Sequence, residues 1–284
     1  MRVGATVAAV TSVLLLSAVP APSQTSQVRV QERHVTGQSV APIFEGWAPN
    51  GDGTFSLFFG YLNRNYEEEL DIPLGPNNMF DQGSTDQGQP THFLPRRHKM
   101  AFAIVVPKDF GDKKGFTWTL TIRGNTEKVT GSLNPIWQVD VAKDTQTNNT
   151  PPVLKVTPDQ TVTMPGAAAL TANVTDDGLP KPRKPREDQK VEPPPPGVFA
   201  DLNEGLTVEW SKYRGPGNVT FENPRQSVVD GKAATRATFS APGEYLLQVV
   251  ADDGSRIRGY HCCWTNALIK VTVKPAPGST GGQP

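Results

Sequence analysis

Short stretches in which apolar and polar residues alternate recur along the chain and predict β-strands. In each stretch every second side chain is apolar, so that one face of the strand is buried and the other faces solvent. The positions in between, such as Thr119 and Glu209, are mostly polar. Four segments show this alternation: Trp118–Ile122, Trp137–Val141, Leu206–Trp210 and Ala267–Val273.

Three further segments are apolar at nearly every position: Phe55–Leu62, Met100–Val106 and Tyr245–Val250. A strand that is apolar on both faces is typical of the centre of a covered sheet, so we expect each of them to be a central strand. The sequence Asn50-Gly51-Asp52-Gly53 predicts a tight hairpin turn between Phe44–Trp47 and the first of these segments.

The composition supports the same fold class. Of the 284 residues, 26 are Gly and 27 are Pro, and these residues punctuate turns and interrupt helices. We therefore predict an all-β fold with two β-sandwich-like domains. Lys and Arg together number 28, as do Asp and Glu. This balance gives no reason to expect a nucleic-acid or anionic-membrane partner.

The order of the segments predicts two domains after a leader. Arg2 is followed by an apolar run, Val7–Val19, that is too short to span a bilayer. We expect a signal peptide whose removal leaves no stable membrane span, and a periplasmic or extracellular location. A buried N-terminal helix is disfavoured by the polar sequence that follows. The predicted parts are a signal peptide (1–23), a flexible segment (24–41), a β-rich domain (42–143), a linker (144–152), a β-sandwich (153–274) with a proline-rich insert (180–204), and a disordered tail (275–284).

Six motifs follow one another in the second half of the chain: Pro158–Val162, Asp176–Pro180, Val208–Lys212, Gly215–Gly217, Phe239–Tyr245 and Ala251–Gly254. In this order they resemble the PKD (polycystic kidney disease) repeat. The resemblance implies an immunoglobulin-like sandwich that serves spacing, adhesion, or protein or carbohydrate contact, without catalysis. The chain departs from the family in its insert at 181–204 and in lacking the Trp-Asp-Phe-Gly-Asp-Gly form of the central strand.

Two aromatic residues of this domain are predicted to be structural. Trp210 lies in an alternating strand, as the core tryptophan of a sandwich does. Tyr245 follows Pro242-Gly243 near the start of a late strand, where a tyrosine hydroxyl can bond back to the backbone.

Cys262 and Cys263 are adjacent and are the only cysteines. In a regular strand their side chains face opposite sides of the sheet, so a bond between them requires a distorted turn. An oxidising compartment permits such a vicinal disulfide. The alternatives are two reduced, partly buried thiols beside Trp264, or a bridge to another chain. A thiol nucleophile is not expected, because the one base nearby in the sequence is His261.

The sequence contains no recognisable catalytic or cofactor motif. None of the four histidines has metal-ligand spacing, and no nucleophile elbow, phosphate loop or dinucleotide fingerprint occurs. We therefore expect no enzyme activity, no cofactor and no metal. One alternative is calcium at two Asp-Asp-Gly sequences, although we favour ordinary turns there. The residues concerned are Asp176, Asp177, Asp252 and Asp253.

A long stretch without periodicity, Asp71–Pro95, is predicted to be a surface loop, and loops of this length are functional or disordered. Acidic residues precede it and basic residues follow it. One interpretation is that these charges pair across neighbouring strands. The other makes the loop and its basic edge a recognition surface for an acidic or carbohydrate ligand. That surface would consist of His92, Phe93, Arg96, Arg97 and His98.

The sequence therefore predicts a secreted or periplasmic, non-catalytic binding or accessory protein of the bacterial envelope. The first domain would recognise an envelope protein or carbohydrate, and the second would act as a spacer. Two other classes stay open. One is a structural component of an envelope assembly, and the other is an unrecognised hydrolase that uses carboxylates such as Glu68 and Asp71.

Overall fold

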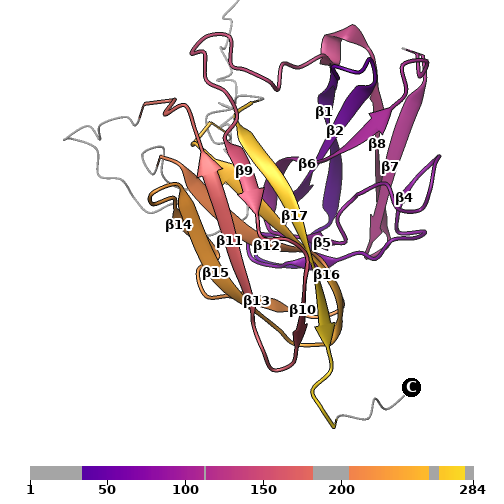
Figure 1. Cartoon of the computed structure of the whole chain (residues 1–284). Coiled ribbons are helices and arrows are strands. Elements are labelled where there is room, and N and C mark those ends of the chain that lie inside the picture. Colours follow the sequence, from indigo (N-terminus) through magenta and orange to yellow (C-terminus); the bar gives the residue numbers. More distant parts are fainter. Residues whose placement is uncertain (1–33, 112, 182–204, 256–261, 279–284) are drawn as a thin grey trace, which may run out of the picture. The chain divides into compact units, whose positions relative to one another are not determined.

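The computed structural model describes residues 34–111, 113–181, 205–255 and 262–278, which form β-strands joined by turns and loops (Figure 1). They belong to one compact unit that begins at His34. The predicted all-β, sandwich-like fold class is confirmed. The helical element within these residues is a short 3-10 turn, η1 (Pro135–Trp137). In this part of the chain, no helix has the length and hydropathy needed to cross a bilayer.

Several predicted parts lie outside the described residues. These are the signal peptide (1–23), residues 24–33 of the flexible segment, residues 182–204 of the proline-rich insert, His261, and residues 279–284 of the tail. Two separate hydrophobic clusters occupy the described residues. One runs from Val40 to Leu133 and the other from Ala168 to Val273. The predicted domain boundaries stay predictions.

The first region, residues 34–143, contains two three-stranded sheets, in the orders β1-β2-β6 and β4-β7-β8, and a short pair, β3-β5. The hairpin turn predicted at Asn50–Gly53 joins β1 to β2, and the Asn50 N–H donates to the Thr54 carbonyl oxygen (2.8 Å). The strands are β1 (Val40–Pro49), β2 (Phe55–Asn63), β3 (Leu70–Asp71), β4 (Asn78–Phe80), β5 (His92–Phe93), β6 (Arg96–Val106), β7 (Gly115–Ile122) and β8 (Asn125–Ser132).

Aromatic rings from both three-stranded sheets meet in the core of the first region. The Phe59 ring of β2 contacts the rings of Phe44, Phe80 and Trp118. A Cβ on Gly131 of β8 would lie 2.8 Å from the rings of Phe44 and Phe59, so glycine is needed for this close approach. The alternation in β7 is thus explained, because one face of that strand, which includes Trp118, packs into the core.

Two expectations for this region are wrong, and one of its strands had no prediction. Trp137–Val141 is not a strand. Asn134 and Pro135 begin η1, in which the Asn134 Oδ1 accepts the Ile136 N–H (3.1 Å), and Trp137 stays 49% exposed. The polar strand β8 was not expected, yet it pairs with β7 along its whole length. The segment Met100–Val106 lies in β6, which is an edge strand rather than a central one.

The stretch from Asp71 to Pro95 is also not a plain surface loop. It contains β4 and β5, and the side chains of Asn78, Gln89 and Phe93 are completely buried. The Asn78 amide donates to the carbonyl oxygens of Ile72 (3.0 Å) and Pro90 (2.7 Å). These bonds replace the strand pairing that an aperiodic segment lacks.

The second region, residues 144–278, is a two-layer sandwich. A five-stranded sheet has the order β10-β17-β16-β12-β14 and a four-stranded sheet the order β13-β15-β11-β9, and side chains of both enter one core. The strands are β9 (Val153–Val156), β10 (Gln160–Thr163), β11 (Ala168–Thr175), β12 (Thr207–Arg214), β13 (Val219–Phe221), β14 (Arg225–Ser227), β15 (Lys232–Phe239), β16 (Gly243–Asp252) and β17 (Trp264–Lys274).

The two aromatic residues predicted to be structural both lie in this core. Trp210 is 2% exposed and Tyr245 is 1% exposed. The Tyr245 hydroxyl donates to the Ala241 carbonyl oxygen (2.8 Å). A Cβ on Gly215 would lie only 2.1 Å from the Tyr245 ring, so this glycine makes room for the ring.

Candidate functional site

The five residues predicted as a recognition surface do not share one exposed face. Phe93 is completely buried in the aromatic core, and His92 is only 5% exposed. They therefore hold the first region together rather than present a common surface. The other three have partners inside the same region: Arg96 lies over the Tyr66 ring, Arg97 pairs with Glu45, and His98 stacks on Tyr61.

A cluster of four ionisable side chains joins the two regions. The His92 ring lies between two carboxylates, with Nδ1 2.9 Å from Asp71 and Nε2 3.1 Å from Glu69. The Nζ of Lys212, on β12, lies 3.1 Å from the same Asp71 carboxylate. Because β3 pairs with β5 in register, Asp71 and His92 are cross-strand neighbours.

The electrostatics of this cluster favour the charged forms. Burial lowers the pKa of His92, but hydrogen bonds to Asp71 and Glu69 outweigh it and leave this pKa above its ordinary value. The hydrogen bond from His92 holds the pKa of Glu69 below its usual range. Burial opposes ionisation of Asp71, yet His92 and Lys212 lower its pKa overall. Protonated His92 donates from both ring nitrogens, so neither nitrogen can then accept a proton from a substrate.

Glu68, the other carboxylate considered for hydrolysis, is part of a surface contact. Its Oε2 accepts the Gly37 N–H (2.7 Å), and its Oε1 pairs with Arg123 (2.5 Å). The pKa of Glu68 lies below its usual range, chiefly because of the Arg123 hydrogen bond. Glu68 and Arg97, on either side of the 71–95 stretch, thus pair with Arg123 and Glu45 and not with each other.

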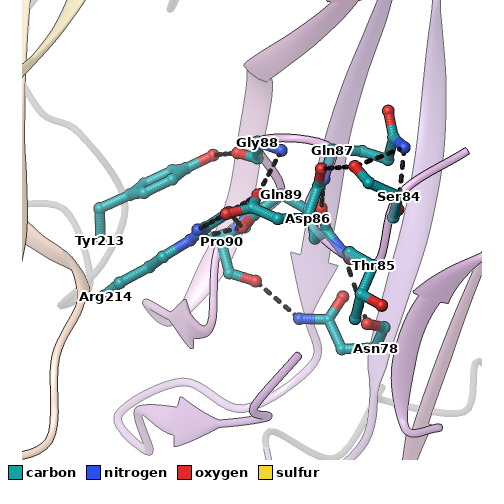
Figure 2. A network of polar contacts seen from close by, with 10 residues as sticks. All are labelled: Asn78, Ser84, Thr85, Asp86, Gln87, Gly88, Gln89, Pro90, Tyr213 and Arg214. Atoms are coloured by element: carbon teal, nitrogen blue, oxygen red, sulfur yellow. Dashed lines mark hydrogen bonds and ion pairs between the residues drawn. The ribbon is translucent and has the colours of Figure 1, made fainter. Parts of the chain in front are cut away.

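The segment Asp81–Pro90, which we name the docking loop, is held against β12 by polar contacts (Figure 2). The Arg214 guanidinium makes two bonds to the Asp86 carboxylate, of 2.7 and 2.8 Å, and donates to the Gln89 carbonyl oxygen (2.9 Å). The Tyr213 hydroxyl donates to the Gly88 carbonyl oxygen. Burial raises the pKa of Tyr213 far above its ordinary value, so this hydroxyl keeps its proton. Figure 2 shows Tyr213 and Arg214 reaching the loop side by side.

A cleft of about 540 Å³ is bounded by β6 and β17. We name it the β6–β17 cleft. Its lining includes two runs of consecutive residues, Met100–Ala103 and Trp264–Leu268, together with Phe58 of β2 and Tyr213 of β12. Among the lining residues that the structure describes, none is Asp, Glu, Lys, Arg or His. Apolar concave sites of this size are typical of ligand binding.

Four polar side chains that line the cleft donate a hydrogen bond to a backbone carbonyl. The amides of Gln248 and Asn266 each have a second N–H and an oxygen acceptor besides this bond. The four bonds, donor first, join Asn266 to Met100 (2.8 Å), Gln248 to Ala101 (3.1 Å), Thr265 to Pro152 (2.6 Å), and Tyr213 to Gly88.

β6 is bulged where it meets the second region. The pairing register between β2 and β6 shifts between Phe59 and Tyr61, and Met100 has a left-handed φ of +43°. The carbonyl oxygens that accept the Asn266 and Gln248 amides belong to Met100 and its neighbour. The extra residue of a β-bulge changes the direction of the strand backbone.

Cys262 and Cys263 are joined by a disulfide. Both are buried, and Cys263 has a φ of +127°, the distorted backbone that a bond between neighbours requires. Cys262 lines the β6–β17 cleft. The sulfur of Cys263 lies 3.3 Å from the Asn149 carbonyl oxygen, so the predicted linker packs against the disulfide.

Asn149 also meets a buried carboxyl. Its amide donates to Asp253 Oδ2 (2.9 Å) and to the Ser255 hydroxyl (2.9 Å), and its own Oδ1 is buried without a hydrogen-bond partner among the described residues. Burial raises the pKa of Asp253 to about 6, even though Ser255 and Asn149 donate to the carboxylate.

The four aspartates considered as calcium ligands act as turn residues. Within the ranges that the structure describes, no group of three or more His, Cys, Asp or Glu side chains is placed to hold a metal ion. In each case a carboxylate oxygen accepts a backbone N–H two residues further on: Asp176 from Gly178, Asp177 from Leu179, Asp252 from Gly254, and Asp253 from Ser255.

No family model and no curated protein matches the chain. Three of the solved structures that are similar to the chain at low identity follow. The D00-D0 domain of Intimin is 12% identical, with a TM-score of 0.26, and the match covers 83% of this chain and 99% of that one. The endo-fucoidan hydrolase MfFcnA4 from glycoside hydrolase family 107 is 13% identical, with a TM-score of 0.27, and coverage of 88% and 28%. A protein of unknown function from Porphyromonas gingivalis W83 is 9% identical, with a TM-score of 0.24, and coverage of 82% and 98%. At these TM-scores the similarities carry no argument about function.

The cleft and the docking loop contain residues that the sequence patterns did not single out. Tyr213 and Arg214 follow a recognised strand, but nothing in the local pattern pairs them with Asp86. Met100–Val106 was noted for its apolar side chains and assigned to the wrong place in a sheet. The flanking Lys99 and Pro107 were the available signal, because such residues commonly protect the ends of an edge strand.

Proposed function

We propose that this chain is an exported, non-catalytic binding protein of the bacterial envelope that takes a protein or carbohydrate ligand in the β6–β17 cleft. The observation that carries the proposal is the cleft itself, with its volume of about 540 Å³ and the uncharged side chains of its described lining. Recognition is thereby assigned to the cleft instead of His92 and the basic residues after it.

Export is supported by two features. The N-terminal sequence has the charge and the short apolar run of a signal peptide. A disulfide between Cys262 and Cys263 suits an oxidising compartment outside the cytoplasm. We also propose that the second region is PKD-like, on the strength of its ordered motifs, its two-sheet sandwich and the Tyr245 hydrogen bond to the backbone.

The absence of catalysis is part of the proposal. It is supported by the pairing of the candidate groups: both ring nitrogens of His92 lie against carboxylates, and Glu68 is paired with Arg123. Turnover on a panel of hydrolase substrates that is lost in both Glu68→Ala and Asp71→Asn would contradict this part.

A binding screen tests the proposal directly. The secreted protein is applied to arrays of envelope glycans and of peptides, and hits are measured again with two variants. Leu268→Glu places a charge in the cleft, whereas Val229→Glu places one at an exposed position outside its lining. We expect the first to weaken binding roughly tenfold or more and the second to leave it unchanged, because a charge in an apolar site loses hydration without a partner. Hits that Leu268→Glu leaves intact, or no hits on either array, would refute the proposal.

A further inference from the structure

β6 has the sequence of a central strand but the position of an edge strand. Its run Met100-Ala-Phe-Ala-Ile-Val-Val106 contains no charge and no proline. In the order β1-β2-β6 it is the last strand, and no other described strand pairs with its far edge. Unpaired backbone along an apolar edge is a template for another strand, and proteins ordinarily blunt such edges.

The protection of this edge is confined to its ends. Lys99 and the bulge at Met100 guard one end, and Pro107 guards the other. Between them Val105 is 63% exposed. The part of the edge nearest the bulge, up to Ala103, borders the β6–β17 cleft.

We propose that the ligand of the cleft is an extended, uncharged peptide segment that adds to β6 as a further strand. This inference rests on the proposed function, because it names the class of ligand that the cleft takes. Strand addition of this kind obtains affinity from backbone hydrogen bonds and specificity from alternate side chains. At ~3.3 Å per residue, the stretch from Phe102 to Val106 accommodates a partner strand of about five residues.

The open edge of β6 favours a peptide over a sugar. In the part of the chain that the structure describes, no strand pairs with this edge, and the hydrogen-bonding groups of an unpaired strand edge are complementary to another backbone. A sugar is recognised through side chains that hydrogen-bond its hydroxyls, and the amides of Gln248 and Asn266 each already donate one hydrogen bond to a carbonyl oxygen of β6.

Charge complementarity defines the chemistry of the segment. Among the described residues that line the cleft there is no acid, lysine, arginine or histidine, so a charged side chain that enters it would lose hydration without gaining an ion pair from them. Several lining residues, such as Ala101, Ala103 and Ala267, have small side chains. The segment should therefore carry small or apolar residues on the side that enters the cleft.

The test uses the full secreted chain and a display library of random heptapeptides. Selected peptides are synthesised in two forms, unmodified and with N-methyl groups on alternate residues, and their binding is measured by calorimetry. Val105→Lys places a charge on the exposed edge, and Val229→Lys is the matched control at a valine that is 68% exposed. We expect N-methylation in one alternate register and Val105→Lys each to weaken binding roughly tenfold or more, and Val229→Lys to have no effect.

The outcomes separate this inference from the proposed function. Two outcomes would overturn strand addition and leave the binding function standing. One is that the peptides bind equally well when N-methylated. The other is that the ligand is a glycan whose binding Leu268→Glu weakens. If the protein sediments as a dimer that Val105→Lys dissociates, the edge binds a second copy of the chain. That result would also overturn the proposal of a peptide ligand. No ligand of either class would refute both.

Discussion

Replacing Asp253 with asparagine should stabilise the protein at neutral and alkaline pH. Burial raises the pKa of this carboxyl to about 6, against 3.8 for an ordinary aspartate. A carboxyl whose pKa is raised by folding contributes stability that is fully present below its unfolded pKa and is lost as the pH rises through its folded pKa. The wild-type protein should therefore lose stability between about pH 4 and about pH 7.

The expected gain follows from the pKa difference. Each pKa unit corresponds to ~1.4 kcal/mol, so a rise from ~4 to ~6 limits the effect to ~3 kcal/mol. Solvent screening reduces this limit, and the carboxylate loses some favourable hydrogen bonding on replacement, so we expect ~1–2 kcal/mol. The new amide has an acceptor at hand, because a half-turn of the Asn149 amide presents its unpartnered Oδ1.

Urea unfolding of the wild type and Asp253→Asn at about pH 5 and about pH 8 measures the difference on either side of the shifted pKa. Asp109→Asn removes a charge at an exposed position and serves as the control. The reasoning is refuted if Asp253→Asn is less stable than the wild type at the higher pH. It is also refuted if both proteins show the same pH dependence.

Three further substitutions test other contacts by urea unfolding. His92→Phe should lower the free energy of unfolding by ~1–2 kcal/mol at about pH 6 and by less at about pH 8.5. The pKa of His92 is raised in the folded protein, so its contribution to stability is lost as the pH rises through that pKa. An equal loss at both pH values would contradict this. Arg214→Ala should cost ~1–3 kcal/mol, and a double-mutant cycle with Asp86→Ala should show coupling between the two; strictly additive losses would mean that their two-bond pair contributes nothing. Tyr245→Phe should cost ~1 kcal/mol through the lost bond to the Ala241 carbonyl oxygen, and an unchanged stability would show that the bond has no net value.

The alternating strands could be predicted because their two faces meet different surroundings. β7 and β17 each bury one row of side chains in a core, and the apolar rows are visible in the sequence. β8 lacks such a row. It exists because it pairs with β7, and because Gly131 lets the rings of Phe44 and Phe59 approach. A pattern of side chains cannot reveal a strand whose stability comes from its neighbour's backbone.

The position of a strand within its sheet was less predictable than its existence. β2 and the Met100–Val106 part of β6 are both apolar at nearly every position, but among the described strands of this sheet only β2 has partners on both sides. Sequence pattern reports how much of each face is covered, and says nothing about whether the edge is paired. An apolar run such as Met100–Val106 therefore has two explanations. Either a neighbouring strand of the same sheet pairs with its edge, or a binding partner does.

The sequence pattern did not predict the candidate site for a related reason. The residues of β12 and β6 that make contacts between the two regions lie at bulges. The register between β12 and β16 shifts between Lys212 and Arg214, and Tyr213 and Arg214 both bond to the docking loop. In a regular strand, neighbouring side chains point to opposite faces, so a reading based on alternation assigns these two residues to different surroundings. The bulge at Met100 likewise lies where β6 accepts the amides from β16 and β17. The bulges at which the two regions make contact are thus the positions where the regular alternation of side chains is broken. In this chain, breaks in the register of strands indicate the cleft better than any motif does.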